Sequence, residues 1–289
     1  MISETHLNAL ACPNCRFPLH ERAGALACAN AECAATFPVR NGVPILLGES
    51  DPDGYYHGEQ VKWDGVLAYG LGGTPPRRVP DFERFALGSN MLRDAYRHLR
   101  GSSGTVLDVG CGAGYSAMAL AGWARRVYTF DISETGVRAL NSAAQAQDVR
   151  NVFACCANAE RLPYPDGLFD AVFGKAVLHH LRLPVVLPEL SRVMKKGARA
   201  AFCEPLAHNP VVNAVRFIKH HWIDSYPGTD KPFRFEDAER FRPYFSRVEF
   251  VATTYLKDRV PLLAPLERAM LRVPPLRRRA TYGTILLEK

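Results

Sequence analysis

Short apolar runs alternate with stretches of helical periodicity from about residue 105 to the end of the chain. The runs predict seven strands, over residues 105–109, 126–130, 151–155, 169–173, 198–203, 247–255 and 281–287. The periodic stretches predict helices over 114–124, 134–146 and 184–194. This alternation favours an α/β fold with a doubly wound, Rossmann-like, mostly parallel sheet. The last two strands, joined through a Pro- and Arg-rich helical insertion, predict a closing antiparallel hairpin.

The chain before residue 105 has a different pattern, and we divide the protein into residues 1–50, 51–80 and 81–289. The linker region from residue 48 to 80 is rich in Gly, Pro and Asp, which breaks regular structure and marks a boundary or a lid. Its aromatic residues favour a lid over the active site, with an irregular, ring-packed loop as the alternative; they are Tyr55, Tyr56, Trp63 and Tyr69. The stretch 81–100 predicts one amphipathic helix after an N-cap at Asp81.

Length and composition place the protein among globular chains. With 289 residues, 47% of them hydrophobic, it can bury a sizeable core in one large domain with a small appendage. No apolar stretch approaches the ~20 residues that a membrane-spanning helix needs. The N-terminus also lacks the basic and apolar regions of a signal peptide. We therefore expect a cytoplasmic protein, and the sequence indicates no particular oligomeric state.

The formal net charge of +7 is concentrated near the C-terminus. Residues 1–206 hold 21 Lys/Arg and 20 Asp/Glu, whereas residues 207–289 hold 15 and 9 and include the run Arg277, Arg278 and Arg279. A basic patch there could meet RNA, anionic lipid or an acidic substrate. The simpler interpretation is a solvated surface.

Four of the eight cysteines lie within the first 33 residues, in the pattern Cys12-x2-Cys15-x12-Cys28-x4-Cys33. Two short loops that each carry a cysteine pair can supply the four soft ligands of a tetrahedral zinc ion. In a cytosolic chain such pairs favour metal binding over disulfides. The second loop is wider than the usual two residues. Four thiolates leave no open coordination position, so we expect a structural zinc.

The segment LACPNCRFPLHERAGALACANAECAATFPVRNGVPILL resembles the small zinc-ribbon proteins that activate certain RNA and protein methyltransferases. The shared features are the opening L-x-C-P-x-C, the second cysteine pair, an aromatic-Pro at Phe37 and Pro38, and a closing G-V-P-x-L-L that begins at Gly42. The resemblance covers about 40 residues and implies a zinc ribbon.

The first predicted strand of the main domain runs into the glycine-rich turn VLDVGCGAGYSA, residues 106–117. Gly112-x-Gly114-x-x-Ala117 fits the dinucleotide fingerprint. Gly110-x-Gly112-x-Gly114, with Asp108 two residues earlier, fits the version that binds S-adenosylmethionine (SAM). Asp131 ends the second predicted strand and is placed to accept hydrogen bonds from ribose hydroxyls, which either nucleotide would offer.

The later motifs NAERLPYPDGLFDAVFGKAVLHHL and LSRVMKKGARAAFCEP follow in the order and spacing of class I SAM-dependent methyltransferases, which residues 81–289 resemble. The resemblance implies that SAM is held by Asp108, Gly110, Gly112, Gly114, Asp131, Ile132, Asn158, Ala159 and Lys175. Asn158 replaces the usual Asp against the adenine amino group, and Lys196-Gly197-Ala198 replaces Pro-Gly-Gly at a turn. A dinucleotide enzyme would need a second βαβ half, for which the remaining length offers no obvious room.

Methyl transfer from SAM requires mainly in-line positioning of a nucleophile, with a base where the nucleophile carries a proton. Candidate bases are His179, His180 and His208, and Tyr115 could line the methyl site. The residues after Lys175 lack the Asn/Asp-Pro-Pro-aromatic motif of enzymes that methylate exocyclic amino groups of bases.

Residues 206–245 lie where this family inserts substrate-recognition helices. They hold an aromatic set that suits a small, partly apolar acceptor or a cation: Phe217, His220, His221, Trp222, Tyr226, Phe233 and Phe235. The sequence therefore favours a SAM-dependent methyltransferase acting on a small metabolite. One alternative is an rRNA or tRNA base methyltransferase, because bacterial enzymes that methylate guanine N1 of ribosomal RNA share the layout. The other is a SAM-using enzyme that performs intramolecular displacement.

Overall fold

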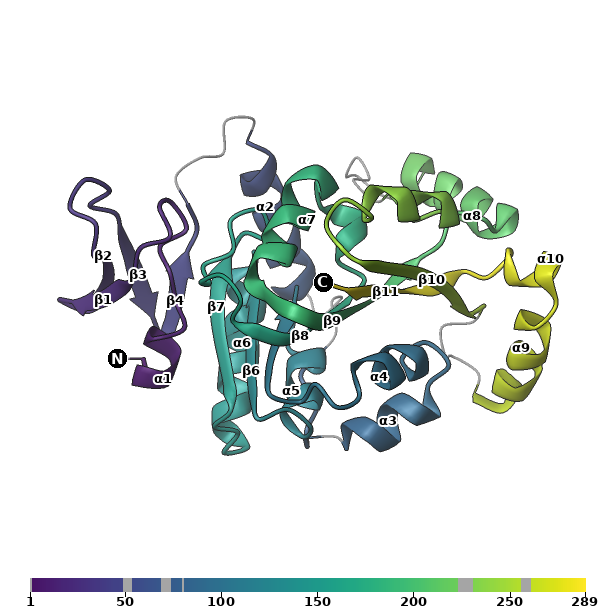
Figure 1. The fold of residues 1–289 in the computed structure, drawn as a ribbon, viewed down its shortest axis with the longest axis horizontal. Coiled ribbons are helices and arrows are strands. Elements are labelled where there is room, and N and C mark those ends of the chain that lie inside the picture. The colour runs from purple at the N-terminus through teal and green to yellow at the C-terminus, as the bar shows by residue number, and fades with distance from the viewer. Residues whose placement is uncertain (1, 49–53, 69–73, 80, 223–230, 256–260) are drawn as a thin grey trace.

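The computed structural model describes residues 2–48, 54–68, 74–79, 81–222, 231–255 and 261–289. It shows a small N-terminal β-unit beside a large α/β unit (Figure 1). The N-terminal unit, which we call the ribbon, consists of α1 (Glu4–Leu7), β1 (Leu19–Arg22), β2 (Ala25–Cys28), β3 (Thr36–Arg40) and β4 (Val43–Leu46). Its strands pair antiparallel in chain order.

The large unit is built on seven strands in the order β7-β6-β5-β8-β9-β11-β10. They are β5 (Thr105–Val109), β6 (Arg126–Asp131), β7 (Val152–Ala157), β8 (Phe169–Lys175), β9 (Met194–Pro205), β10 (Arg247–Thr254) and β11 (Tyr282–Glu288). β5 to β9 pair in parallel, and β11 lies antiparallel between β9 and β10. The predicted mostly parallel sheet with an antiparallel closing strand is confirmed.

Helices cover both faces of this sheet. On one face lie α4 (Arg93–Leu99), α5 (Tyr115–Ala121) and α6 (Glu134–Ala146), and on the other lies α7 (Leu183–Val193). Because successive strand residues point to opposite faces, Val106 packs into the core below α4 and α5, whereas Leu107 packs into the core with α7. Successive apolar residues of β5 therefore pack alternately into the two cores on opposite faces of the sheet.

The ribbon is continuous with the large unit. Its strand β4 pairs in parallel with β7, with Ile45 opposite Cys156 and Leu46 opposite Ala157, which extends the sheet to 11 strands. The buried ribbon residue Leu46 belongs to the same core as α7. Since β7 would otherwise be an open sheet edge, β4 satisfies backbone groups that an edge strand leaves unpaired.

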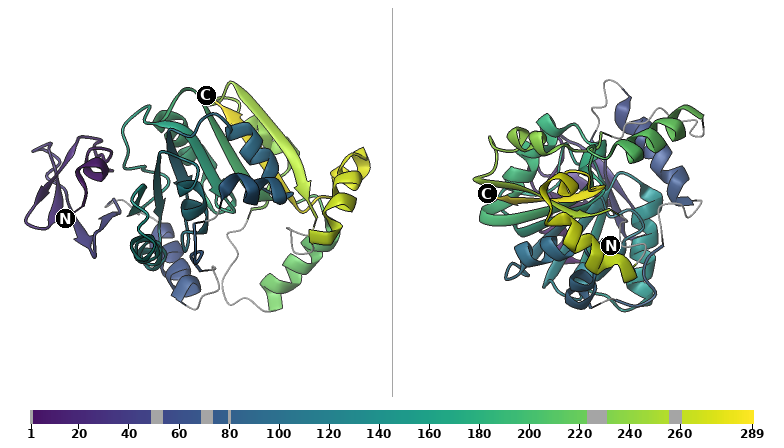
Figure 2. Two further views of the ribbon diagram at one scale, coloured as in Figure 1. Left: turned by 90° about the horizontal axis from the view of Figure 1, so that it is seen from below. Right: turned by 90° about the vertical axis from the view of Figure 1, so that its right-hand side faces the viewer.

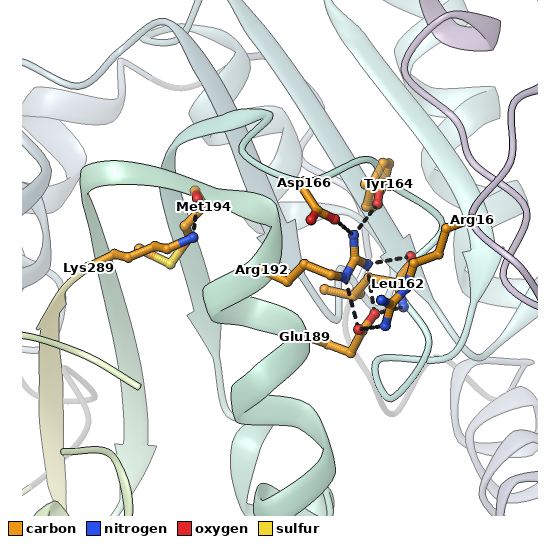
Figure 3. Close-up of polar contacts among 8 residues, drawn as sticks. All are labelled: Arg16, Leu162, Tyr164, Asp166, Glu189, Arg192, Met194 and Lys289. Carbon is orange, nitrogen blue, oxygen red and sulfur yellow. Dashed lines mark hydrogen bonds and ion pairs between the residues drawn. The ribbon is translucent and has the colours of Figure 1, made fainter. Parts of the chain in front are cut away.

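Side chains tie the ribbon to the large unit at a second place. Arg16 of the ribbon lies 2.7 Å from Glu189 of α7, whose carboxylate also accepts two hydrogen bonds from Arg192 (Figure 3). Arg192 in turn donates to the carbonyl groups of Leu162 and Tyr164 and pairs with the exposed Asp166. The network joins the ribbon, α7 and the segment after β7.

Two predicted elements differ from the structure. The single helix expected over 81–100 is two helices, α3 (Phe82–Gly88) and α4. The break follows from Ser89, which is buried and accepts a hydrogen bond from the Leu92 N–H at 3.0 Å, as a helix-capping hydroxyl does. The linker, expected to lack regular structure, contains the 14-residue helix α2 (Tyr55–Ala68). Tyr69 lies outside the described residues.

The remaining elements are η1 (Leu178–His180), which lies between β8 and α7, and a set that follows β9. This set consists of α8 (Pro210–Trp222), η2 (Phe235–Arg240), η3 (Pro261–Leu263), α9 (Ala264–Leu271) and α10 (Pro274–Arg277). α8, α9 and α10 lie at the end of the molecule opposite the ribbon (Figures 1 and 2). Among the helices of the described segments, none has the length and apolar composition to span a bilayer.

Candidate active site

A cavity of about 400 Å³ opens at the carboxyl ends of β5, β6, β7 and β8. This is where the strand order reverses, since β6 and β8 flank β5 on opposite sides, and ligands of open α/β sheets bind at such a point. The volume lies in the range of small-molecule sites. Its wall on the sheet side includes Gly110, Gly112, Asp131, Ile132, Asn158, Ala159 and Lys175. Helix α2 (Tyr55–Ala68) contributes Tyr55, Tyr56, Glu59, Trp63 and Leu67, and Tyr115 and His180 also line the cavity.

The glycines after β5 differ in what surrounds them. Gly110, Gly112 and Gly114 all have positive φ, at 70°, 52° and 93°, which glycine adopts without a steric penalty. A Cβ on Gly110 would lie 2.5 Å from Val177, and one on Gly114 would lie 2.5 Å from Leu140. A Cβ on Gly112 would meet no protein atom within 4 Å. Gly112 is thus the glycine whose backbone faces open space in the cavity.

Asp108 lies directly beneath this loop and is fully buried. Its Oδ2 atom accepts hydrogen bonds from the hydroxyls of Ser116 and Thr129, both at 3.0 Å. Its Oδ1 atom has no hydrogen-bond partner within the described structure. Burial raises the pKa of Asp108 to about 7, because removal from water disfavours the charged carboxylate. The carboxyl therefore has spare acceptor capacity beneath the loop.

Asp131 ends β6 and joins the glycine loop to the start of α6. Its carboxylate accepts hydrogen bonds from the Gly112 N–H at 2.8 Å and the Ser133 N–H at 2.9 Å, one on each oxygen. Each oxygen can accept a further hydrogen bond, and Asp131 lines the cavity. Burial is the main cause that raises the pKa of Asp131. The neighbouring Ile132 also lines the cavity.

The third part of the sheet-side wall follows β7. Asn158 lines the cavity, and its side-chain oxygen accepts a hydrogen bond from the Glu160 N–H at 2.9 Å. This bond orients the amide, and Ala159 beside it is buried. Lys175 ends β8, with its ammonium 5.9 Å from the centre of the Tyr115 ring. Seven of the nine predicted SAM contacts thus line one cavity, whereas Gly114 packs against Leu140 and Asp108 is buried.

The predicted bases occupy three different environments. His180 lines the cavity, and its ring lies edge-on to Trp63 with 5.0 Å between ring centres. His179 is buried and points away, with Nδ1 donating to Glu204 at 2.6 Å. His208 accepts a hydrogen bond from the Phe235 N–H at 3.0 Å and stacks on that ring. Neither His179 nor His208 is among the cavity-lining residues.

Glu204 is a buried carboxylate that the sequence analysis did not select. Besides His179, it accepts hydrogen bonds from the N–H groups of Val177 and Leu178 at 3.0 and 2.8 Å. It therefore holds the turn η1 that presents His180 to the cavity. The E-P at the end of the second quoted motif was the available signal for this residue.

The cavity is covered by α2, whose inward face is formed by residues four positions apart. Tyr55, Glu59, Trp63 and Leu67 all line the cavity, which is the spacing of one helix face. The sequence contains this spacing, but the many glycines and prolines of the linker favoured an irregular structure over a helix. Three of the four aromatic residues of the linker therefore lie on a helix that lines the cavity, and the role of this helix as a lid stays a prediction.

Two polar clusters hold α2 against the cavity. Arg182 forms hydrogen bonds with the buried carboxylate of Glu160, the shortest at 2.9 Å, and contacts the hydroxyl of Tyr56. The Tyr55 hydroxyl donates to the carbonyl oxygen of His180 at 2.6 Å. At the other end, Asp64 accepts hydrogen bonds from the Ser133 hydroxyl and the Thr135 N–H at the start of α6. Helix α2 thus contacts the loop after β6 and the turn η1 after β8, and it reaches the segment after β7 through Arg182.

The insertion 206–245 contributes no described residue to the cavity wall. Phe233 packs in the core with Phe241 and Phe250, Phe235 stacks on His208, and Phe217 is 60% exposed. Tyr226 and the side chains of His220, His221 and Trp222 lie outside the described residues. A role of this insertion in substrate recognition stays a prediction.

The four ribbon cysteines converge as the spacing predicted. Their sulfur atoms all lie within 4.8 Å of one another, with 3.3 Å between Cys15 and Cys28 and 3.8 Å between Cys12 and Cys33. Tetrahedral Zn–S bonds of about 2.3 Å would place sulfurs about 3.8 Å apart. The residue after each pair, Arg16 or Ala34, has positive φ. Each of the two loops that carry a cysteine pair thus ends in a tight turn.

Part of the chain is similar to known proteins. Residues 107–202 match a family described as "Methyltransferase domain". The chain is 32% identical over 117 residues to an uncharacterized methyltransferase, YcgJ, of Bacillus subtilis, and 40% identical over 101 residues to 27-O-demethylrifamycin SV methyltransferase of Amycolatopsis mediterranei. These matches cover 40% and 33% of this chain and 46% and 36% of the relatives. The chain thus spans less than half the length of these two relatives.

Among solved structures, geranyl diphosphate C-methyltransferase from Streptomyces coelicolor has a similar fold. The TM-score is 0.55 at 19% identity, over 83% of this chain and 99% of the other. Together with the glycine loop and Asp131, these findings identify residues 107–202 as a class I SAM-dependent methyltransferase domain.

Proposed function

We propose that the protein transfers the methyl group of SAM to a small, partly apolar acceptor. The observation that carries this proposal is the division of one cavity into two unlike walls. The sheet-side wall offers backbone amides and the carboxylate of Asp131, whereas α2 offers the rings of Tyr55 and Trp63. A polar nucleoside and an apolar acceptor would each find a complementary wall.

The residues of the sheet-side wall fit SAM. Gly112 leaves open space where a ligand can approach the backbone, and Asp108 has a buried oxygen with spare acceptor capacity. Asp131 would accept hydrogen bonds from ribose hydroxyls, and Asn158 and Ile132 would contact the adenine. When bound, SAM supplies a sulfonium-activated methyl group.

The chain's own contribution is positioning, exclusion of water and removal of a proton. Helix α2, which lines the cavity opposite the sheet, would limit the access of water, and in-line placement of an acceptor accounts for most of the acceleration such a reaction needs. His180 is the cavity-facing imidazole that would accept the proton of a hydroxyl or amino acceptor. Tyr115, beside Lys175, would line the methyl site.

The second part of the proposal concerns the ribbon, which would hold one structural zinc ion through Cys12, Cys15, Cys28 and Cys33. The sulfur separations support tetrahedral coordination by four thiolates. Elemental analysis of the purified protein should then find about one zinc per chain, and its absence would refute this assignment.

Titration calorimetry with SAM tests the cofactor site. Replacing Asp131 with Ala should weaken SAM binding at least tenfold, because a charged hydrogen-bond acceptor contributes about 1.5–3 kcal/mol. The matched control is Glu239→Ala, which removes an exposed carboxylate far from the cavity. Equal SAM affinity in both variants would contradict the proposed site.

The acceptor class is tested by incubating the protein with methyl-labelled SAM and a cell extract. Label in the small-molecule fraction supports the proposal. Label in ribonuclease-sensitive material would favour the RNA methyltransferase alternative. Release of methylthioadenosine without S-adenosylhomocysteine would instead indicate intramolecular displacement.

A further inference from the structure

Exposed apolar side chains are concentrated at the end of the molecule opposite the ribbon. Of the 14 large apolar residues exposed in the described chain, nine lie in the segments 210–218 and 262–279, and the other five are scattered over the rest. We call this part, residues 210–218 and 262–279, the distal end (Figure 2). Scattered exposed apolar residues are ordinary, whereas a concentration marks a contact surface.

The exposed residues of α8 form a stripe. Val211, Val215 and Ile218 are 70%, 60% and 53% exposed, and their spacing of four and three places them on one helix face. The opposite side of α8 faces the protein, where Asn213 donates to the carbonyl of Ala207 at 2.6 Å. α8 therefore turns its apolar stripe toward solvent.

The adjoining segment adds more aliphatic side chains. Leu262 is 88% exposed and Leu266 is 57% exposed. The Asn209 side chain, just before α8, donates to the carbonyl of Arg279 at 2.8 Å, which ties the start of α8 to the end of α10. The two apolar groups thus belong to one end of the molecule, as both views show (Figures 1 and 2).

The exposed charge of this segment is positive. Residues 261–280 contain five arginines and one acid, Glu267. Glu267 is buried and accepts hydrogen bonds from Thr254 and the Tyr255 N–H. Arg277, Arg278 and Arg279 are all exposed directly after Leu276. Within the described residues, this segment therefore presents aliphatic side chains beside exposed arginines.

We propose that the distal end binds the surface of an anionic lipid bilayer. Aliphatic side chains enter the boundary between headgroups and acyl chains, while arginines pair with anionic headgroups. RNA would favour aromatic side chains on which bases stack, but the exposed set in the described distal end holds one aromatic, Phe217. A symmetric dimer through this surface would place like-charged arginines against each other. Charge and apolar character together therefore favour the bilayer.

The test is co-sedimentation of the full chain with vesicles of equal parts phosphatidylglycerol and phosphatidylcholine, with pure phosphatidylcholine vesicles for comparison. We expect binding to the anionic vesicles only, weakened by salt. Each arginine near an anionic surface contributes about fivefold, so replacing Arg277, Arg278 and Arg279 with Ser should lower partitioning about a hundredfold. Leu262→Asp combined with Leu266→Asp should lower it at least tenfold.

The matched control is Val185→Asp, which places the same charge at a 44% exposed position on α7. Its partitioning should equal that of the unchanged protein, and circular dichroism of every variant verifies folding. Absence of sedimentation with anionic vesicles would overturn the proposal, as would equal losses in the control. Self-association that the leucine variants abolish, without vesicle binding, would assign the surface to a second copy. Because the assay measures binding and not turnover, its outcome is independent of the proposed methyl transfer.

Discussion

The buried Asp108 makes the stability of the protein depend on pH in a direction that can be worked out from its surroundings. Burial raises its pKa from 3.8 to about 7. Between these two values the unfolded chain has lost the proton that the folded chain retains. Ionisation then favours the unfolded state, so the contribution of Asp108 to stability falls as pH rises from about 4 to 7 and levels off above.

The size of this effect follows from the shift. About three pKa units at about 1.36 kcal/mol each give a ceiling near 4 kcal/mol. Asp108→Asn removes the titration, so the free energy of unfolding of the variant relative to the unchanged protein should rise by about 2.5 kcal/mol from pH 5 to pH 8. Urea unfolding without SAM at several pH values measures this difference.

Ser116→Ala provides a second readout at the same carboxyl. It removes one hydrogen bond that lowers the pKa of Asp108, so the midpoint of the pH dependence should move to higher pH. If the stability difference between Asp108→Asn and the unchanged protein were constant from pH 5 to pH 8, the inferred pKa would be wrong.

Three further perturbations test the ribbon, the lid and the turn η1. Cys33→Ser should lower the zinc content and the unfolding temperature together, because the ribbon shares a core with α7; an unchanged temperature with zinc lost would contradict this. Arg182→Leu removes the guanidinium that pairs with the buried Glu160, which should lower the free energy of unfolding by about 1–3 kcal/mol. The variant should also be cleaved faster by trypsin after Lys62 in α2. An unchanged cleavage rate would argue that Arg182 does not hold α2 in place. Glu204→Gln removes a carboxylate that accepts three hydrogen bonds and should lower the free energy of unfolding by about 1–3 kcal/mol. If urea titration gave a smaller loss of unfolding free energy, neighbouring groups would be able to replace the hydrogen bonds of the Glu204 carboxylate.

The features that the sequence determined are those encoded by neighbours in the chain. The strands of the main sheet follow from apolar runs, and β5 and β6 agree with their predicted ranges to within one residue. The cysteine spacing predicted the convergence of Cys12, Cys15, Cys28 and Cys33, since two turns suffice to bring each pair together. The glycine loop and Asp131 were visible for the same reason.

The tertiary structure alone decided which distant segments meet. β4 pairs with β7 across more than a hundred residues, and Tyr55 reaches the carbonyl of His180 across 125. The sequence around these residues predicts neither contact. Strand pairing uses backbone groups that every sequence shares, and the residues on one face of a helix do not specify which distant segment they contact. The separation of His180, which faces the cavity, from His179, which faces Glu204, likewise depended on how η1 packs. Local patterns specify elements, whereas packing between distant elements selects the side chains that share a cavity.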